Sequence, residues 1–307
     1  MRLPWAGNTE EEFYGFYEGL SRGHFPFNVI DEEALNEDLG QYELIIFPNS
    51  TCLSKKEADK VRNFVKGGGN IISTFETSLY NESGKKLDNF ELRDVFGIGN
   101  AGEIFGPLNW DFMSPADNTH FSLKEIRNNF ITAPTYGLRL KANAKVPVLF
   151  CKPLAGSYAG TPEVTSFPFL IENLYGKGRS TYMAGTFGGS LHKFHFPDYY
   201  QILFNLVNEY SNPFVTLANA PSSVEVNVRK KENSIFVYLI NFTSEMRRPV
   251  QNIIPCQNIK IDIRLNAKVK SVKALASGEH LKFTSKENSI SFVLPVIEDY
   301  EVMEIKC

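Results

Sequence analysis

The stretch from residue 42 to residue 80 constrains the fold most, because a strand, a helix and a second strand follow one another there. Residues 44–47 form an unbroken apolar run, as a strand buried on both faces requires. Ser54, with Glu57 three residues later, has the pattern of a helix capping box, and consecutive glycines end the helix. Residues 70–75 predict a second buried strand. The stretch predicts two neighbouring parallel strands joined by a helix.

The ends of these two strands are the first place to expect a functional site. A helical crossover between parallel strands is right-handed and brings the carboxyl ends of both strands to one edge of the sheet. Ligands of open α/β sheets gather at that edge. The segments that reach it are residues 49–53 and residues 76–80. We therefore look for chemistry in these two segments.

The N-terminal part predicts a helix followed by a strand. Thr9 caps a helix that extends to Leu20, and residues 25–30 have the composition of a short strand. The side of the helix expected to be buried carries Phe13, Phe16, Tyr17 and Leu20. An open α/β sheet normally starts with a strand, whereas this pattern starts with a helix. We therefore expect further chain to precede Met1.

The rest of the first domain is less regular. Residues 91–96 predict a short helix or a turn that ends at Gly97, and residues 97–145 have the character of an insertion and loop. Strands are expected at residues 146–154, 167–174 and 179–184, with a tight hairpin turn before the last. Residues 198–210 have helical spacing and predict the closing helix. These elements predict an α/β domain with a flavodoxin-like open parallel sheet and helices on both faces.

After Pro213 the pattern changes to short alternating runs separated by polar turns. Alternation of this kind predicts antiparallel strands with one buried and one solvated face. The expected strands are residues 224–228, 235–242, 259–263, 269–274, 280–284, 290–294 and 301–305. They predict an all-β antiparallel sandwich with polar outward positions. The predicted domains are therefore residues 1–213 and 214–307.

Composition excludes several classes of function. The formal net charge is −3, and no basic stripe alternates with aromatic residues as nucleic-acid binding requires. No apolar run approaches the roughly 20 residues that span a bilayer. We expect neither nucleic acid nor a membrane as partner, and the lack of a visible secretory signal indicates a cytoplasmic protein. Cysteines that are far apart should remain thiols, and no metal or other cofactor is expected; they are Cys52, Cys151, Cys256 and Cys307.

Two residues at the strand ends could carry chemistry. Cys52 follows the first strand, but a nucleophilic cysteine at a sharp elbow needs small neighbours, a histidine and a carboxylate, so a packed thiol is favoured. Glu76 follows the second strand and could bond a sugar hydroxyl or, more commonly, a backbone amide of the next turn. Glycosidases use two carboxylates about 5–9 Å apart. No pattern in the sequence pairs Glu76 with a second one.

Two loop regions are further candidates for contact with a ligand or a partner. His192 and His195 precede Pro197, which predicts a loop. Asp198 is near them, but no cysteine or third histidine is close enough in sequence to favour a metal. They could contact a neighbouring chain or a glycan, or be ordinary surface imidazoles. Trp110 and Asp111 could hold a sugar, although an interface or local packing is favoured. No catalytic residue is expected, and the candidate ligand-binding residues are Glu76, Trp110, Asp111, His192 and His195.

Three segments of the first domain resemble the trimerisation domain of bacterial beta-galactosidases and related glycoside hydrolases: ELIIFPNSTCLSKKEADKVRNFVKGGGNIISTFETSLY, NFELRDVFGI and NLYGKGRSTYMAG. The tail resembles the β-sandwich that closes such hydrolases, in VEVNVRKKENSIFVYLINFT and ISFVLPVIEDYEVMEI. The resemblance implies a class I glutamine-amidotransferase-like fold and a homo-oligomer, with a trimer as the expected state. In that family a (β/α) barrel precedes both domains and carries the catalytic acid and nucleophile. The sequence contains no such barrel.

Three functions are compatible with these observations. The first is a non-catalytic accessory and oligomerisation region of a beta-galactosidase-like hydrolase, which acts on or near carbohydrate only together with a separate catalytic barrel. The second is a stand-alone carbohydrate-binding protein, which needs exposed aromatic residues along one groove. The third is a hydrolase or amidotransferase that uses Cys52 or Glu76 and needs a histidine within hydrogen-bond reach. We favour the first, because it requires no catalytic pattern and none is found.

Overall fold

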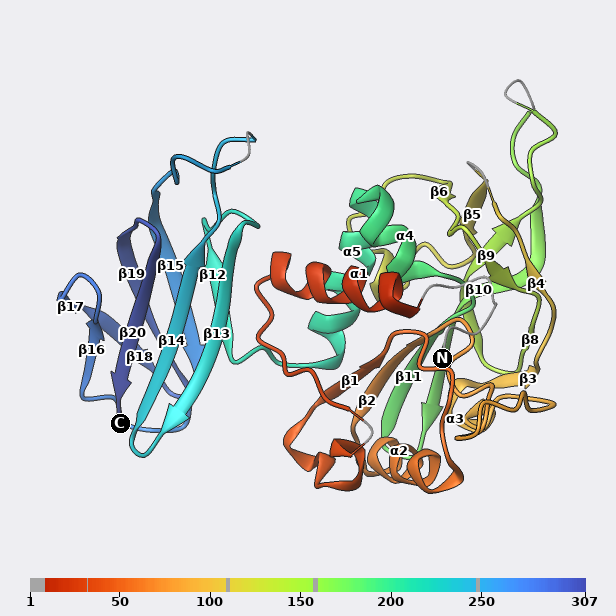
Figure 1. Ribbon diagram of the computed structural model, residues 1–307, viewed down its shortest axis with the longest axis horizontal. Coiled ribbons are helices and arrows are strands. Elements are labelled where there is room, and N and C mark those ends of the chain that lie inside the picture. The colour runs from red at the N-terminus through yellow and green to blue at the C-terminus, as the bar shows by residue number, and fades with distance from the viewer. Residues whose placement is uncertain (1–8, 32, 109–110, 157–159, 247–248) are drawn as a thin grey trace. The chain divides into compact units, whose positions relative to one another are not determined.

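The chain forms two compact units in a computed structural model, which describes residues 9–31, 33–108, 111–156, 160–246 and 249–307 (Figure 1). The first unit contains Met1–Tyr17 and Ile30–Asn212, and the second contains Glu18–Val29 and Pro213–Cys307. Within the second unit, His24 Nε2 donates a hydrogen bond to the carbonyl oxygen of Pro221 at 3.0 Å. The N-terminal segment therefore contributes residues to both units.

The predicted strand, helix and strand are confirmed. They are β1 (Leu44–Phe47), α2 (Lys55–Gly67) and β2 (Asn70–Thr74). The two strands pair in parallel, and the capping box is complete. Ser54 Oγ accepts the Glu57 N–H at 3.3 Å, and the Glu57 carboxylate accepts the Ser54 N–H at 2.7 Å. The helix ends at Gly68, whose φ of 121° suits glycine.

The main sheet of the first unit is mixed. Among the described residues it has seven strands in the order β1-β2-β11-β10-β9-β5-β6. The further strands are β5 (Phe112–Pro115), β6 (Ile131–Thr132), β9 (Lys145–Cys151), β10 (Val164–Tyr175) and β11 (Gly178–Met183). β11 is parallel to β2, whereas β10 and the strands beyond it pair antiparallel. The short turn at Gly176 imposes this reversal, because so short a connection joins only antiparallel strands. The α/β class is confirmed, with the parallel arrangement confined to β1, β2 and β11.

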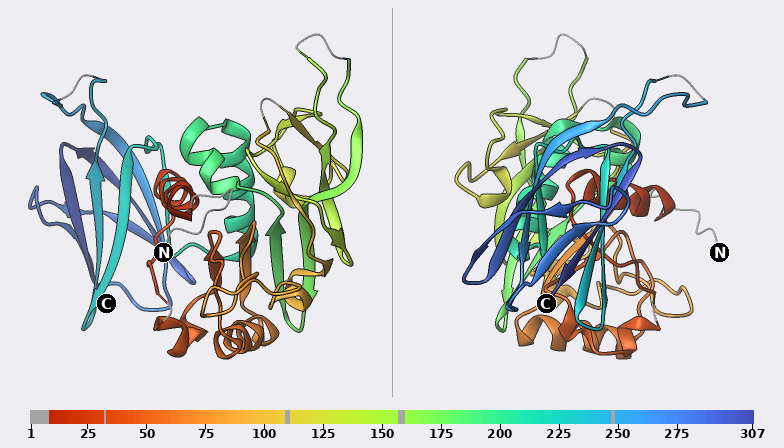
Figure 2. Two further views of the ribbon diagram at one scale, coloured as in Figure 1. Left: turned by 45° about the vertical axis from the view of Figure 1, so that its right-hand side comes forward. Right: turned by 90° about the vertical axis from the view of Figure 1, so that its left-hand side faces the viewer.

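Helices cover both faces of this sheet (Figures 1 and 2). Besides α2 they are α1 (Thr9–Arg22), α3 (Arg93–Phe96), α4 (Phe187–Phe194) and α5 (Pro197–Tyr210), with short 3₁₀ helices at Ala34–Asn36, Leu39–Gln41 and Phe121–Leu123. Neighbouring residues of a strand point to opposite faces. In β11, the Thr181 hydroxyl lies 2.6 Å from the Tyr210 hydroxyl of α5, whereas Ser180 Oγ donates to the Val95 carbonyl of α3 at 2.5 Å. Figure 1 shows α2 on the side of α3, and α1 and α4 on the side of α5.

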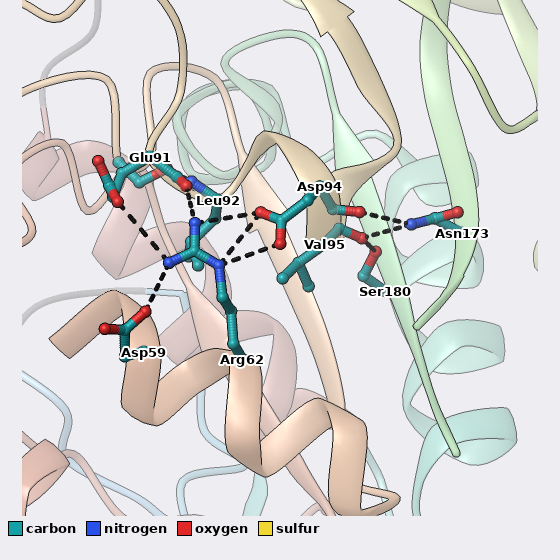
Figure 3. Close-up of polar contacts among 9 residues, drawn as sticks. Asp59, Arg62, Glu91, Leu92, Asp94, Val95, Asn173 and Ser180 are labelled. Atoms are coloured by element: carbon teal, nitrogen blue, oxygen red, sulfur yellow. Dashed lines mark hydrogen bonds and ion pairs between the residues drawn. The ribbon is translucent and has the colours of Figure 1, made fainter. Parts of the chain in front are cut away.

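Arg62 of α2 connects this helix to α3 (Figure 3). Its guanidinium donates to the Asp94 carboxylate at 3.0 Å and to Asp59 at 2.9 Å, and it also bonds the Glu91 carbonyl. Burial acts to raise the pKa of Asp94, but the Arg62 hydrogen bonds outweigh it and hold that pKa below its ordinary value. At the other end of α3, Asn173 donates to the carbonyl of Val95 at 2.9 Å. A helix of one turn is thus fixed at both ends by side chains from its neighbours.

The side of α1 that is buried agrees only in part with the predicted one. Phe16 and Leu20 are buried as expected, but Phe13 and Tyr17 are exposed. The buried side carries Gly15, where an added Cβ would stand 1.8 Å from the carbonyl oxygen of Gly188 in α4. The close approach of two glycines sets the rotation of this helix, and bulky aromatic side chains cannot occupy the contact. The prediction weighed hydrophobicity and missed this steric requirement.

Two further expectations are corrected. The described residues 25–30 form no strand, and Pro26 within them lacks the N–H that sheet pairing uses. Residues 97–145 contain short strands that are too brief for periodicity to reveal, including two that extend the main sheet. The others are β3 (Ile98–Asn100) paired with β8 (Lys141–Ala142), and β4 (Ile104–Phe105) paired with β7 (Gly137–Leu138).

The second unit is the expected antiparallel β-sandwich. Its described residues form one sheet in the order β12-β15-β19-β18 and another in the order β13-β14-β20-β16-β17. The strands are β12 (Val215–Ala218), β13 (Val224–Lys231), β14 (Ser234–Asn241), β15 (Cys256–Arg264), β16 (Ser271–Ala274), β17 (His280–Leu281), β18 (Phe283–Lys286), β19 (Ser289–Ile297) and β20 (Tyr300–Lys306). Aliphatic side chains from both sheets fill the core, among them Val237, Ile261 and Phe292. β12 was not predicted, and the strand expected at residues 280–284 is divided between the two sheets.

The outer surface of β14 departs from the polar pattern expected for the sandwich. Tyr238 and Ile240 are exposed on it, and Tyr300, which pairs with Ile240 from β20, is 59% exposed. Phe242, directly after β14, is also exposed. The expectation of polar outward positions is therefore wrong for this strand, because its alternation is between aliphatic and aromatic residues.

We expect Arg62→Met to destabilise the first unit by about 1–2 kcal/mol, because the charged hydrogen bonds are lost from a partly exposed site. Since the folded pKa of Asp94 is depressed, its contribution is complete above the unfolded pKa of about 4 and disappears as the pH falls through the folded value. Urea unfolding should show a larger difference from wild type at pH 7 than at pH 2. Lys56→Met, at an exposed position of α2, is the control. An equal effect of both substitutions at pH 7 would contradict the role of Arg62.

Candidate functional site

The two predicted strand-end segments lie against each other. The Tyr80 N–H donates to the Thr51 carbonyl at 3.0 Å, and the Leu53 N–H donates to the Tyr80 carbonyl at 3.0 Å. Closer to the strands, Asn49 Oδ1 accepts the Glu76 N–H at 3.0 Å. The segments that follow β1 and β2 are thereby joined into one hydrogen-bonded layer at the carboxyl-end edge of the sheet.

Glu76 is part of the interior of this layer. It is 1% exposed, and the Tyr80 hydroxyl donates to its Oε1 at 3.1 Å. Burial raises the pKa of Glu76, and the Tyr80 hydrogen bond and the charge of Lys86 offset only part of that rise. Burial and the nearby Glu76 raise the pKa of Tyr80 as well. The contacts of Glu76 are those of a residue that stabilises a turn, and a sugar has no exposed carboxylate to bind there.

Cys52 is a half-buried free thiol beside this layer. Thr51 Oγ1 donates to its sulfur at 3.7 Å. Within the residues that the structure describes, no histidine nitrogen forms a hydrogen bond with Cys52 or Glu76; His120, for example, bonds Ser122. The activated nucleophile that a cysteine hydrolase requires is therefore not assembled at this edge.

The edge contains a residue that the sequence did not single out, Glu12 of α1. Its side chain is fully buried, and its Oε2 accepts the Gly188 N–H at 2.8 Å and the Thr74 hydroxyl at 3.2 Å. Gly188 lies in the first turn of α4, where free N–H groups and the helix dipole favour an acidic group. Only glycine at position 188 leaves room for the Glu12 carboxyl group, because a Cβ added there would stand 2.7 Å from Glu12 Oε2. Glu12 joins α1, β2 and α4 at one point.

The burial of Glu12 raises its pKa to about 8, and the hydrogen bonds from Gly188, Gly189 and Thr74 oppose that rise only in part. Its Oε1 is buried without a hydrogen-bond partner, which fits a carboxyl group that is neutral at pH 7. In open α/β folds the equivalent position, outside the strand ends and at a helix N-terminus, is where anionic ligands bind. Here a side chain of the protein occupies it.

His192 lies in the last turn of α4, where a loop was predicted, whereas His195 follows the helix in the short connection to α5, as predicted. Pro197 begins α5 and does not break the preceding segment, so α4 extends to Phe194. The ring of His192 lies 5.7 Å from the ring of Tyr14 in α1, and His195 Nδ1 lies 3.2 Å from the Tyr200 hydroxyl. The structure thus places them next to aromatic residues. Across the described ranges, no group of three acidic, histidine or cysteine side chains could hold a metal ion.

Asp111 has a local structural contact, and Trp110 lies outside the described residues. The Asp111 side chain is 8% exposed, and its Oδ1 accepts the Leu154 N–H at 3.0 Å. Leu154 lies just beyond β9, in the hairpin that joins β9 to β10 and projects from the unit in Figures 1 and 2. Asp111 therefore holds the base of that hairpin, far along the chain from Glu76 and from the histidines.

A second buried polar group was also missed from sequence. His120 Nε2 lies 2.9 Å from Glu172 Oε2, and His120 Nδ1 lies 2.8 Å from the Ser122 hydroxyl. The hydrogen bond from His120 holds the pKa of Glu172 below its ordinary value. The order of serine, histidine and carboxylate is that of a hydrolytic triad, but Ser122 is fully buried within a 3₁₀ helix that His120 caps by accepting the Ser122 N–H. The separation of His120 and Glu172 along the chain concealed the pair.

Solved structures of larger glycosidases contain the same fold. An alpha-L-fucosidase isoenzyme from Paenibacillus thiaminolyticus matches with a TM-score of 0.74 and 16% identity, over 99% of this chain and 46% of that chain. A beta-galactosidase from Bacillus circulans matches with a TM-score of 0.66 and 21% identity, over 97% of this chain and 38% of that chain. The two units of this chain thus have the fold of a part of each of these longer proteins, and the described residues contain no (β/α) barrel.

The chain belongs to the beta-galactosidase trimerisation domain family, whose model matches residues 6–197. Among curated relatives, the beta-galactosidase GalA of Bacillus licheniformis is 26% identical over 76% of this chain and 31% of its own length. The beta-galactosidase BgaP of a Planococcus species is 25% identical over 84% of this chain and 36% of its own length. The chain spans about a third of the length of these relatives. In the described ranges, no helix is long and apolar enough to cross a bilayer.

We expect the stability difference between Glu12→Gln and wild type to depend on pH. A carboxyl group whose folded pKa is raised to about 8 binds more protons in the folded state, so the wild type loses stability as the pH rises from about 4.5 to 8. Glutamine has no such titration and keeps the oxygen that accepts the Gly188 N–H. From pH 5 to pH 8 the variant should gain a few kcal/mol relative to wild type, at about 1.4 kcal/mol per pKa unit.

Urea unfolding at both pH values measures this change. Glu82→Gln, in an exposed turn, is the matched control and should track the wild type at each pH. A Glu12→Gln variant whose difference from wild type is constant between pH 5 and pH 8 would show that Glu12 is ionised in the folded protein.

Proposed function

We infer that this chain is a non-catalytic assembly region of a beta-galactosidase-like glycoside hydrolase. In this proposal it forms a homo-oligomer, with a trimer as the expected state, and acts near carbohydrate only together with a separate catalytic barrel. The observation that carries the proposal is the match of a trimerisation-domain family over residues 6–197. The share of the relatives that the chain spans, about a third, supports it, because most of their length lies outside the match.

The contacts at the strand ends favour this function over catalysis. A glycosidase needs two accessible carboxyl groups that face one sugar. Glu76 is buried against Tyr80, and Glu12 is buried against Gly188. Cys52 lacks a histidine partner in the described part of the chain. These contacts give no support to the hydrolase and amidotransferase hypotheses.

The remaining sequence-based expectations stay predictions. Binding of a ligand by Glu76, Trp110, Asp111, His192 or His195 has no direct support, and the contacts of Glu76 and Asp111 favour structural roles. The position of His192 beside the exposed ring of Tyr14, and of His195 at the end of α4 beside Tyr200, fits contact with another chain better than contact inside a pocket. A glutamine-amidotransferase-like ancestry and a cytoplasmic location likewise remain proposals.

Light scattering coupled to size-exclusion chromatography tests the assembly role, and hydrolysis of a nitrophenyl galactoside tests catalysis. The proposal predicts a particle of three times the 34.7 kDa chain mass and no hydrolysis above the buffer rate. Glu76→Gln and Cys52→Ser should change neither result beyond small effects on stability. A monomer would contradict the assembly role. Hydrolysis that disappears in either variant would instead establish the catalytic hypothesis.

A further inference from the structure

The outward side of α1 is unusual for a surface helix. It carries Phe13, which is 36% exposed, and Tyr14, which is 42% exposed, with Tyr17 one turn further on. A helix on the surface of a globular protein normally has one apolar side toward the core and a polar side toward water. α2 of the same chain follows this rule, with an exposed side made of Lys55, Lys56, Asp59, Asn63 and Lys66. α1 has bulky aromatic groups on the side opposite its core contact.

The end of α4 continues this surface. The ring of Tyr14 lies 5.7 Å from His192, which connects α1 to α4. Two residues after His192, Phe194 is 41% exposed and stacks on Phe196 with ring centroids 5.3 Å apart. We define the aromatic surface as Phe13, Tyr14, Tyr17, His192, Phe194 and Phe196.

Buried contacts hold the residues of the aromatic surface in a fixed arrangement. Glu12 and Gly15, on the buried side of α1, contact Gly188 of α4 and so fix the helix in place. The stacked ring of Phe196 lies 5.6 Å from the buried ring of Tyr199 in α5. Rigid aromatic side chains lose little conformational freedom when a partner covers them, and such residues dominate the energy of protein interfaces.

We propose that the aromatic surface is the contact through which one copy of this chain binds another. The inference deepens the proposed assembly function and rests on it. A second copy is the partner that the observations favour, because every residue of the surface lies within residues 6–197, the range matched by the trimerisation domain family. A second apolar surface, around Tyr300 of the sandwich, lies outside that range.

A ring of three copies imposes a further condition. Contacts in such a ring are heterologous, so the aromatic surface of each copy meets a different surface of the next copy. One substitution in the chain therefore alters every interface of the ring. A change in the surface should abolish the oligomer outright, without leaving a stable dimer.

The test compares two double variants by light scattering over a dilution series. Tyr14→Lys with Phe194→Lys changes the aromatic surface, and Phe242→Lys with Tyr300→Lys changes the sandwich surface, where both aromatic residues are at least as exposed. We expect the first variant to be monomeric where the wild type is oligomeric, because association should be weakened by at least about tenfold for each aromatic group removed. The sandwich variant should keep the wild-type mass. Circular dichroism verifies that each variant is folded.

The outcomes separate the inference from the proposed function. A wild-type oligomer that persists in the aromatic-surface variant overturns the inference and leaves the assembly role standing. The same holds if only the sandwich variant dissociates. A monomeric wild type overturns both.

Hydrogen exchange of the unmodified chain provides a second test that does not depend on a variant being folded. Peptides that cover residues 9–22 and 187–200 should gain protection as the concentration rises through the association range. Protection gained only in other peptides would overturn the inference.

Discussion

The contact of Glu12 with the first turn of α4 is the constraint on which the first unit depends. A carboxyl group from α1 accepts the Gly188 N–H and the Thr74 hydroxyl, while Gly15 lies directly on Gly188. No other residue in place of Gly15 or Gly188 permits this approach without moving backbone atoms. The contact sets the depth and the rotation of α1 together, and therefore decides which of its side chains reach water.

The same contact is consistent with the proposed assembly role of a fold that often binds ligands. Anionic ligands of open α/β sheets bind outside the strand ends, at helix N-termini. In this chain Glu12 takes that position, and the hydrogen-bonded layer around Glu76 and Tyr80 closes the neighbouring strand ends. Because Glu12 occupies the usual ligand position, we look for a contact surface among the exposed aromatic residues on the outer side of α1 and α4.

Sequence alone predicted the elements whose signals are local. The capping box at Ser54, the strand at residues 44–47 and the buried face of α5 all follow from spacing over a few residues. The rotation of α1 could not be predicted, because it depends on a glycine contact between residues far apart in the chain. For the same reason Glu12 and the pair of His120 with Glu172 were missed: a buried polar residue is recognisable only with its distant partner.

The most direct test of this account is the solution mass of a Gly15→Leu variant. Leucine at this position would overlap the Gly188 carbonyl and displace α1, yet it removes none of the exposed aromatic groups. If the Glu12 contact positions α1 for assembly, the variant should retain a folded far-UV circular dichroism spectrum but elute as a monomer, while the wild type is expected to be a trimer. A folded variant that remains a trimer would show that the position of α1 is unrelated to assembly.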